Sequence, residues 1–402
     1  MGVLFFAFLM IQQPKQREAT ERARKERAED KARERQQELK DSLDAVRKIE
    51  EIKKQDEIVA AEMDIDSTLS DSARQIIIDS VKIARKTARA MDKFGPFRAV
   101  AKGTETLHTL ENELLQITFT TKGGKVKTVK LKEYKNHKKD TLVLVDGDAN
   151  YLGYSFYYDG EKIINTDSLY FEASLVDGQN AISMKADLGE GRYIEQYYSL
   201  SPESYLVDYD LRFEKMNGII PPNRSDILLN WQNDIFQQEK NRDYAIGETS
   251  IHFGLLDGDV DWTYKEKELN LVSSTKWISF TQTFFNTTLI AGGHFDKGGR
   301  LESLGESETD TARIGRMQAE LYIPFNNDVS FHFPMQFYFA PNHYSSLKKL
   351  DLGMHEIVPL GQSIFKWVNR WLIIPIFNFL GGFVESYGII ILLLTILIKL
   401  VL

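Results

Sequence analysis

The sequence predicts a mainly β domain between two ends of helical, apolar or charged character. Short runs that alternate apolar and polar residues recur between about Gly103 and Pro341, as expected for strands with one buried face. Gly-containing turn pairs separate these runs, and no long helical patterns lie between them. Strands without intervening helices indicate a large antiparallel double-sheet sandwich, here of roughly fifteen or more strands.

The N-terminus opens with an apolar run from Met1 to Ile11. The run supplies about half of the ~20 residues that a spanning helix needs. No basic residue precedes it and no small-x-small cleavage site follows it, although a signal peptide stays an alternative. We expect residues 1–13 to be part of a transmembrane anchor whose first turns are missing.

Residues 14–103 are predicted to form a charged helical or flexible tether. From Lys15 to Lys54 acidic and basic residues are interleaved, which gives many i,i+4 pairs but no regular apolar stripe. Such a pattern is typical of a solvated helix. A second helical patch, Ile76 to Met91, is aliphatic, and the sequence does not indicate what it packs against.

Residues 104–345 are predicted to form the β-sandwich domain. Apolar and polar residues alternate from Leu114 to Leu131 on both sides of Gly123-Gly124, which is the pattern of a hairpin. The segment Gly292–Arg300 superficially resembles a phosphate-binding loop but lacks the Gly-Lys-Ser/Thr ending. We interpret it as a second hairpin turn.

Residues 346–386 are predicted to be a linker followed by an amphipathic helix at a membrane interface. Tryptophan and basic residues lie beside a continuous apolar surface there, a mixture typical of such helices. Proline should kink this helix. The predicted interfacial site comprises Trp367, Arg370, Trp371 and Pro375.

A Gly-Gly break at 381–382 precedes the last apolar run, residues 387–402, which we expect to start a spanning helix that the chain leaves unfinished. Counted from Ile389, Lys399 lies about 15 Å deep, near the middle of a ~30 Å hydrocarbon core. A lysine at this depth is expensive and marks a function by default. Snorkelling to the headgroups is the alternative that depth alone leaves open.

Composition argues against several classes of function. The formal net charge is -8, so a broad nucleic-acid surface is not expected. The chain has no cysteine, and its 7 histidines are scattered without a metal-binding pair. We therefore expect no metal, no cofactor and no enzymatic activity.

Four segments, each weakly diagnostic alone, resemble in their order those of the YidC family of bacterial membrane protein insertases. They are Lys276–Ile290, Tyr338–Tyr344, Ile373–Asn378 and Tyr387–Lys399. The resemblance implies a periplasmic domain with a galactose-mutarotase-like β-supersandwich, an interfacial helix, and the first helix of a five-helix insertase core. It also implies a multi-pass protein of the bacterial inner membrane with the β domain in the periplasm.

The resemblance further implies a site and partners. In that family a basic residue at the position of Lys399 lines a hydrophilic groove for substrates. Many members have Arg there, and Lys keeps the charge while losing bidentate recognition. We assign Lys399 and Thr395 to this predicted groove. The implied partners are nascent membrane proteins, which the protein would help to insert and fold, the lipid bilayer, and the Sec translocon.

Two alternative functions stay open. One is a mutarotase-like sugar enzyme, although a fold does not determine a function. The other is a periplasmic carbohydrate- or peptide-binding module in which Trp231, Trp262 and Trp277 floor a cleft. Sandwich cores also take tryptophan, so burial of these rings would count against the cleft.

Overall fold

The computed structural model describes residues 93–401 with gaps at 148–149, 225, 264–266, 306–311, 362–363 and 385. The predicted anchor, nearly all of the predicted tether and the patch from Ile76 to Met91 lie outside the described residues. The described residues comprise the β domain, the linker after it and the C-terminal helices.

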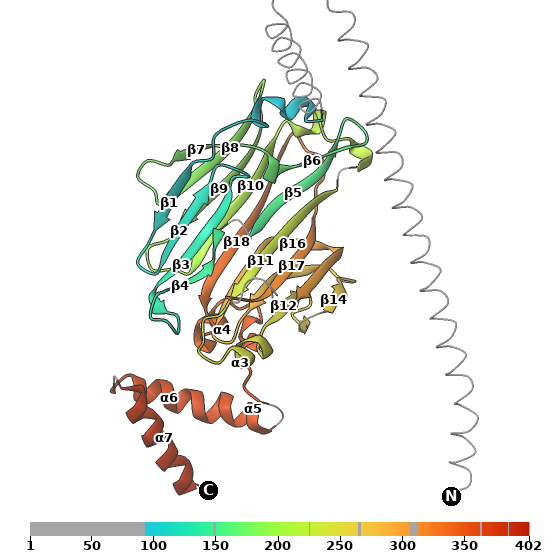
Figure 1. Cartoon of the computed structure of the whole chain (residues 1–402). Coiled ribbons are helices and arrows are strands. Elements are labelled where there is room, and N and C mark those ends of the chain that lie inside the picture. The colour runs from blue at the N-terminus through green and yellow to red at the C-terminus, as the bar shows by residue number, and fades with distance from the viewer. Residues whose placement is uncertain are drawn as a thin grey trace, which may run out of the picture. The chain divides into compact units, whose positions relative to one another are not determined.

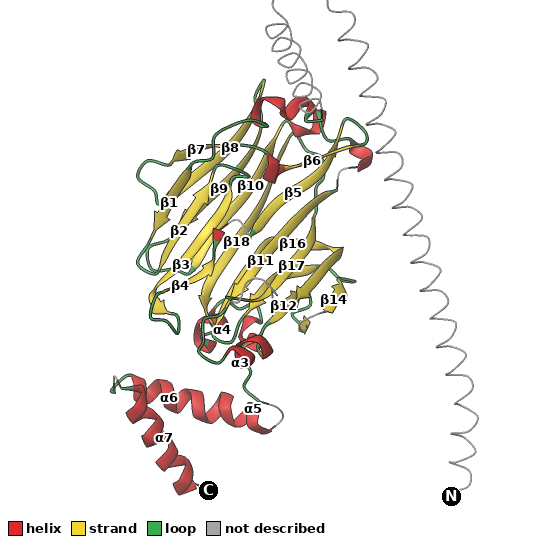
Figure 2. Ribbon diagram, in the orientation of Figure 1, coloured by secondary structure: helices red, strands yellow, loops and turns green. Residues whose placement is uncertain are grey.

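Antiparallel strands are the main regular structure of the described chain (Figure 2), as the alternating pattern predicts. The first nine are β1 (Leu107–Glu111), β2 (Leu115–Thr120), β3 (Lys125–Lys135), β4 (Thr141–Val145), β5 (Tyr151–Tyr158), β6 (Lys162–Asn165), β7 (Glu172–Leu175), β8 (Ala181–Gly189) and β9 (Arg192–Leu200). The others are β10 (Leu206–Glu214), β11 (Ile227–Phe236), β12 (Ser250–Leu255), β13 (Val260–Thr263), β14 (Lys267–Asn270), β15 (Thr275–Thr281), β16 (Phe285–Leu304), β17 (Arg313–Ile323) and β18 (Ser330–Pro341).

Short helices lie before the first strand, between some of the strands and after the last strand. They are η1 (Gly95–Val100), η3 (Thr166–Ser168), η4 (Met216–Gly218), η5 (Pro222–Arg224), α3 (Arg242–Gly247), α4 (Tyr344–Lys349) and η6 (Met354–Ile357). Because these helices are short, the domain is mainly a β structure.

The strands form two sheets (Figure 1). A four-stranded sheet has the order β1-β2-β3-β4. A 14-stranded sheet has the path β6-β5-β11-β17-β16-β18-β10-β9-β8-β7, with β12 to β15 attached beside it. The predicted hairpin is confirmed: Thr120 pairs with Lys125, and both Gly123 and Gly124 have positive φ, as a tight turn requires.

Strand β16 joins the two halves of the large sheet. Its first part pairs with β18 and β15, and its last part pairs with β17 and β14. The register shifts between Asp296 and Arg300. A single long strand therefore makes the two halves of the sheet continuous.

The predicted hairpin turn at Gly292–Arg300 is wrong, because the chain passes through this segment as strand β16. Two of its four glycines, Gly292 and Gly299, lie close to the backbone of a neighbouring strand. A Cβ on Gly292 would lie 2.8 Å from the carbonyl oxygen of Pro334, and one on Gly299 would lie 2.5 Å from that of Glu320. Glycine in a strand often marks such an approach as well as a turn.

Aromatic side chains fill much of the core between the sheets. Tyr198 and Tyr209 stack at 4.5 Å, and the hydroxyl of Tyr209 donates to Gln196 Oε1 at 2.8 Å. Tyr154 and Tyr209 share a further hydroxyl contact. Burial raises the pKa of each of these three tyrosines, so they stay neutral and act as hydrogen-bonding groups of the core.

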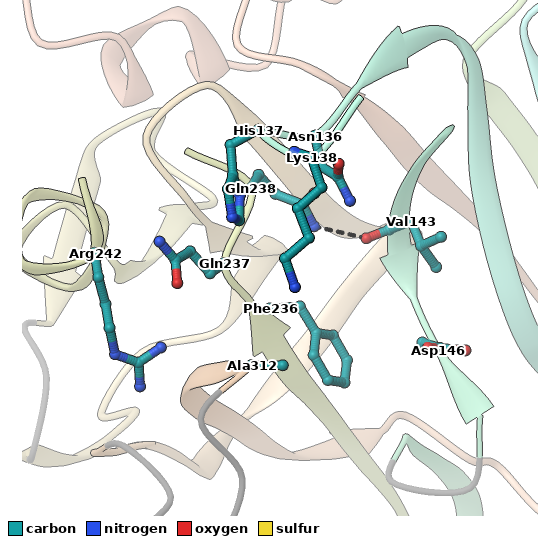
Figure 3. Close-up of a pocket in the computed structure, with 10 residues that line it drawn as sticks. All are labelled: Asn136, His137, Lys138, Val143, Asp146, Phe236, Gln237, Gln238, Arg242 and Ala312. Atoms are coloured by element: carbon teal, nitrogen blue, oxygen red, sulfur yellow. Dashed lines mark hydrogen bonds between the residues drawn. The ribbon is translucent and has the colours of Figure 1, made fainter. Parts of the chain in front are cut away.

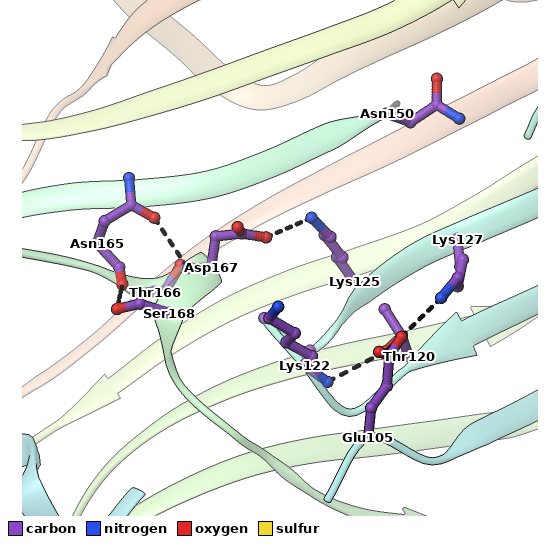
Figure 4. A network of polar contacts seen from close by, with 12 residues as sticks. Glu105, Thr120, Lys122, Lys125, Lys127, Asn150, Asn165, Thr166, Asp167 and Ser168 are labelled. Carbon is purple, nitrogen blue, oxygen red and sulfur yellow. Dashed lines mark hydrogen bonds and ion pairs between the residues drawn. The ribbon is translucent and has the colours of Figure 1, made fainter. Parts of the chain in front are cut away.

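A polar network ties the small sheet to the η3 turn (Figure 4). The ammonium of Lys125 on β3 pairs with Asp167 in η3, and the side chain of Lys125 is 14% exposed. Next to it Lys127 pairs with Glu105 at 2.7 Å, and Thr120 Oγ1 donates to the same carboxylate at 2.8 Å. The Lys125–Asp167 pair joins β3 to η3, and removing one partner of this largely buried pair would leave an uncompensated charge.

Helix η1, near the start of the described chain, packs on the sandwich. Phe97 is fully buried, with its ring 5.8 Å from that of Phe156 and 5.5 Å from that of Tyr158. The residues of η1 fall within the predicted tether, but the ring of Phe97 belongs to the core of the β domain.

We expect Gly254→Ala to lower the free energy of unfolding by about 1–3 kcal/mol, the usual effect of overpacking a core. A Cβ at this position in β12 would overlap the indole ring of Trp277. Gly293→Ala in β16 is the matched control, because a Cβ there meets open space. Urea unfolding of both variants tests this. Equal stability of the two would contradict the packing of Trp277 described here.

Candidate functional site

The predicted interfacial residues lie on one helical segment. It comprises α5 (Ile364–Val368), a π-helical turn (η7, Asn369–Ile373) and α6 (Ile374–Gly381). The amide of Ile374 donates to the carbonyl of Asn369, five residues back. Pro375 has no amide hydrogen, so it cannot make the usual bond to the residue four before it. The wide turn accommodates this missing bond and lets the helix continue.

One face of this segment exposes large apolar side chains. Trp367 is 62% exposed and Trp371 is 65% exposed, and Phe379 is 67% exposed on α6. Residues four apart lie on the same face of a helix, so Trp367, Trp371, exposed Pro375 and Phe379 form one stripe. The structure thus places three of the four predicted interfacial residues on one exposed apolar face. Arg370, the fourth, is half-buried outside this stripe.

Polar side chains hold the helix to the linker that precedes it. Lys366 pairs with Glu356 of η6. Asn369 Nδ2 donates to the carbonyl of Leu360 at 2.9 Å, and Asn378 Nδ2 contacts Ser345 Oγ of α4 at 3.4 Å. The contacts begin in α5 and continue into α6, so they hold more than one turn of the helix.

Arg370 contributes to the electrostatics of these contacts. The pKa of His355 is lowered from its ordinary value, first because burial disfavours the charged ring. The neighbouring cations Arg370, Lys348 and Lys366 lower it further, while Glu356 raises it. His355 is therefore held neutral among the basic groups that join the linker to the helix.

A short elbow follows α6 and leads into α7 (Tyr387–Val401). The amide of Gly382 donates to the carbonyls of Asn378 and Phe379, which closes the end of α6. Beyond the elbow the ring of Tyr387 stacks on that of Phe377 at 6.0 Å.

The predicted groove residues lie on α7. Thr395 and Lys399 are four apart, hence on one face of the helix, and both are exposed. Thr395 Oγ1 donates to the carbonyl of Ile391 at 2.7 Å. Their part in a groove stays a prediction. Within the described part of the chain no helix combines the length and the apolar character needed to cross a membrane.

A small second core, which we call the linker core, packs the linker against the large sheet. The sheet contributes Trp277, Ile290, Tyr338 and Ala340, and the linker contributes Leu347, Met354 and Ile357. Trp277 is fully buried, and its Nε1 donates to the carbonyl of Leu352 at 2.7 Å. Trp277 falls within one of the family-like segments of the sequence, but only the fold reveals that the linker covers it.

The predicted tryptophan cleft is not supported by the burial of these rings. Trp231 is 5% exposed and stacks on Phe280 at 3.8 Å within the main core, and Trp277 belongs to the linker core. Trp262 is 47% exposed and stacks on His252 instead. Two of the three tryptophans are therefore core residues.

The β domain has an open cavity of about 540 Å³ at the ends of β3, β4 and β11 (Figure 3). Seven of its ten lining residues are polar or charged, and the ten are Asn136, His137, Lys138, Val143, Asp146, Phe236, Gln237, Gln238, Arg242 and Ala312. Gln238 Nε2 donates to the carbonyl of Val143 at 2.8 Å, which joins two of its walls. The described residues contain no cluster of three or more His, Asp or Glu that could hold a metal ion.

Comparison with known proteins identifies relatives of this chain. The family model of the YidC periplasmic domain matches residues 107–375. A membrane protein insertase YidC from Parabacteroides distasonis is 31% identical over 84% of this chain and 54% of its own length. The same protein from Phocaeicola vulgatus is 32% identical over 77% of this chain and 51% of its own length. The chain thus spans about half the length of the curated relatives it matches.

Solved structures described as an aldose epimerase homologue and as a galactose mutarotase-like protein are also similar to part of the chain. A GalM/aldose epimerase homologue from C. elegans has a TM-score of 0.36 and 10% identity, covering 59% of this chain and 99% of that one. A galactose mutarotase-like protein from Lactobacillus casei has a TM-score of 0.37 and 11% identity, covering 58% and 100%. Similarity at this level assigns no activity to the present chain.

Proposed function

This chain belongs to the YidC family, and we propose that it is the N-terminal part of a membrane protein insertase of the bacterial inner membrane. The family match carries the proposal, because it runs continuously from β1 into α6 and so joins the β domain to the predicted interfacial helix. We propose that the β domain lies in the periplasm and that the complete protein is multi-pass.

The exposed stripe of α5 and α6 is the proposed contact with the bilayer. Tryptophan rings prefer the headgroup level, where the ring is buried and the indole N–H stays near polar groups. Trp367 and Trp371 have this chemistry, and Phe379 extends the apolar face by two turns. The polar contacts to Glu356 and Leu360 leave this face free for lipid.

Lys399 is the proposed functional cation. A positive charge in a hydrated groove within the bilayer attracts acidic or polar parts of a nascent chain and shortens their path across hydrocarbon. Apolar segments then leave sideways into lipid, because burial of apolar surface is favourable there. Thr395 is on the same face of α7 and would line the groove beside it. Nascent membrane proteins are the proposed substrates, received directly or from the Sec translocon.

The charge of Lys399 is tested with the complete gene in cells depleted of their own insertase. We expect wild type and Lys399→Arg to restore growth and insertion of a small single-span substrate, and Lys399→Ala and Lys399→Glu to fail, because the groove needs a positive charge. Equal rescue by all variants would show that insertion does not require a positive charge at position 399. Failure of wild type would contradict the insertase itself.

The interfacial stripe is tested in the same assay with Trp367→Asp/Trp371→Asp. Two charged side chains at the headgroup level oppose burial of the helix, so we expect insertion to fall severalfold. Controls are Leu175→Asp and Leu256→Asp, since these residues are 61% and 54% exposed on the β domain and lie outside the stripe. Unchanged insertion in the double variant would exclude the stripe as a membrane contact.

A further inference from the structure

We propose that one end of the β domain is a second membrane contact, a cationic surface that rests on anionic phospholipid headgroups. We call it the basal surface and define it as residues 135–140, 237–244, 282–285 and 342–349. The inference rests on the proposed function, because it requires a bilayer beside the β domain. It adds a lipid partner for a part of the chain that the insertase proposal leaves without one.

Four connections far apart in the sequence meet in the basal surface. The amide of His137 donates to the carbonyl of Gln238 at 2.8 Å, joining the β3–β4 hairpin to the loop after β11. Asn342 Nδ2 donates to the carbonyl of Gln282 at 2.9 Å, joining the loop after β18 to the turn before β16. A cavity of about 440 Å³ touches all four connections, and Figure 1 shows α3 and α4 at this same end of the sandwich.

The basal surface is basic in an acidic chain. The chain has 50 Lys and Arg against 58 Asp and Glu, yet this surface reverses the balance. Its basic residues are Lys135, Lys138, Lys139, Lys240, Arg242, Lys348 and Lys349, and its acidic residues are Asp140, Glu239 and Asp243. Both carboxyl oxygens of Glu239 are buried, so this carboxylate faces the protein rather than the surrounding solvent.

Several of these cations are available to a ligand. Lys138, Lys139 and Lys240 are exposed, and among the described residues none of them has a carboxylate within ion-pair distance. Lys138 and His137 also line the cavity of about 540 Å³ together with Arg242 (Figure 3). A phosphate group that entered this cavity would meet donors from two walls. Anionic lipid attracts basic residues that lie near its surface.

The surface also exposes aromatic side chains. Phe284 is 56% exposed at the rim of the smaller cavity, and Tyr244 is 52% exposed on α3. Aromatic rings beside lysines are typical of protein surfaces at the level of lipid headgroups. Cations without rings would fit any polyanion, whereas this combination favours a bilayer surface.

The basal surface is continuous with the proposed membrane helix. Ser345 lies in α4 within the basal surface, and Asn378 of α6 contacts its hydroxyl at 3.4 Å. The linker core holds α4 through buried Leu347. A bilayer that receives α6 therefore comes close to α4 and the loops around it.

The test is vesicle flotation of the full chain. Vesicles contain phosphatidylcholine alone, or phosphatidylcholine with about one third phosphatidylglycerol. We expect wild type to bind both and to bind the anionic vesicles more tightly. Lys138→Glu/Lys139→Glu should lose at least about tenfold in affinity for anionic vesicles and keep its binding to neutral ones. Lys102→Glu/Lys122→Glu has the same charge change at exposed positions outside the basal surface and should behave as wild type.

The outcomes separate the two proposals. If wild type binds neither kind of vesicle, the proposed membrane placement fails and the basal surface fails with it. If wild type binds both kinds equally and the Lys138/Lys139 variant does the same, the basal surface is excluded while the membrane helix stands. Trp367→Asp/Trp371→Asp, by contrast, should weaken binding to both kinds. If inorganic phosphate at millimolar concentration abolished the preference for anionic vesicles, the site would bind free phosphate and the lipid proposal would be overturned.

A measurement of which residues lie at the membrane does not depend on the binding affinity for vesicles. The chain has no cysteine, so a single introduced cysteine carries a spin label without background. We expect a label at Asn136→Cys to be shielded from a water-soluble relaxation agent in anionic vesicles, and one at Lys122→Cys to stay accessible. Equal accessibility of the two labels would overturn the proposal.

Discussion

The indole of Trp277 fixes the path by which the chain leaves the β sandwich. The ring is fully buried between the large sheet and the linker, and its N–H donates a hydrogen bond to the carbonyl of Leu352. A buried indole N–H without a partner would destabilise the fold, because it would have lost its hydrogen bond to water and gained none in return. Gly254 beneath the ring has no Cβ, which leaves room for it. The linker consequently lies on the sheet as a packed layer rather than as a free tether.

The position of everything after the linker depends on this packing. Glu356, next to Met354 and Ile357 of the linker core, pairs with Lys366, and Leu360 accepts from Asn369. These polar contacts occupy one side of the α5–α6 helix and leave its tryptophans outward. A sandwich with a docked linker can therefore hold an amphipathic helix in a set orientation, which a disordered connection could not do. In the proposed insertase, the β domain would thus have a mechanical role.

Local patterns predicted most elements of the fold, and tertiary contacts account for the rest. The strands, the Gly123-Gly124 hairpin and the exposed stripe of Trp367 and Trp371 follow from periods of two and about 3.6 residues, which a sequence shows directly. The course of β16 could not be predicted in this way. Gly292 and Gly299 are glycines because a neighbouring strand lies close to them, and in a sequence such glycines look the same as those of a turn. The role of Trp277 and the basic character of the basal surface depend on segments that only the fold brings together. The groove around Lys399 stays a prediction, since spacing along one helix does not give its partners.

The distance between the sandwich and the α6 helix tests the docked linker most directly. Spin labels at Lys297→Cys on β16 and Phe379→Cys on α6 report this distance by pulsed electron paramagnetic resonance. The chain has no cysteine of its own, so only these two positions carry a label. A docked linker predicts one narrow distance distribution, which broadens in Trp277→Ala while the strands stay folded. A broad distribution in the chain with Trp277 intact would contradict the account, because the helix would then move independently of the β domain.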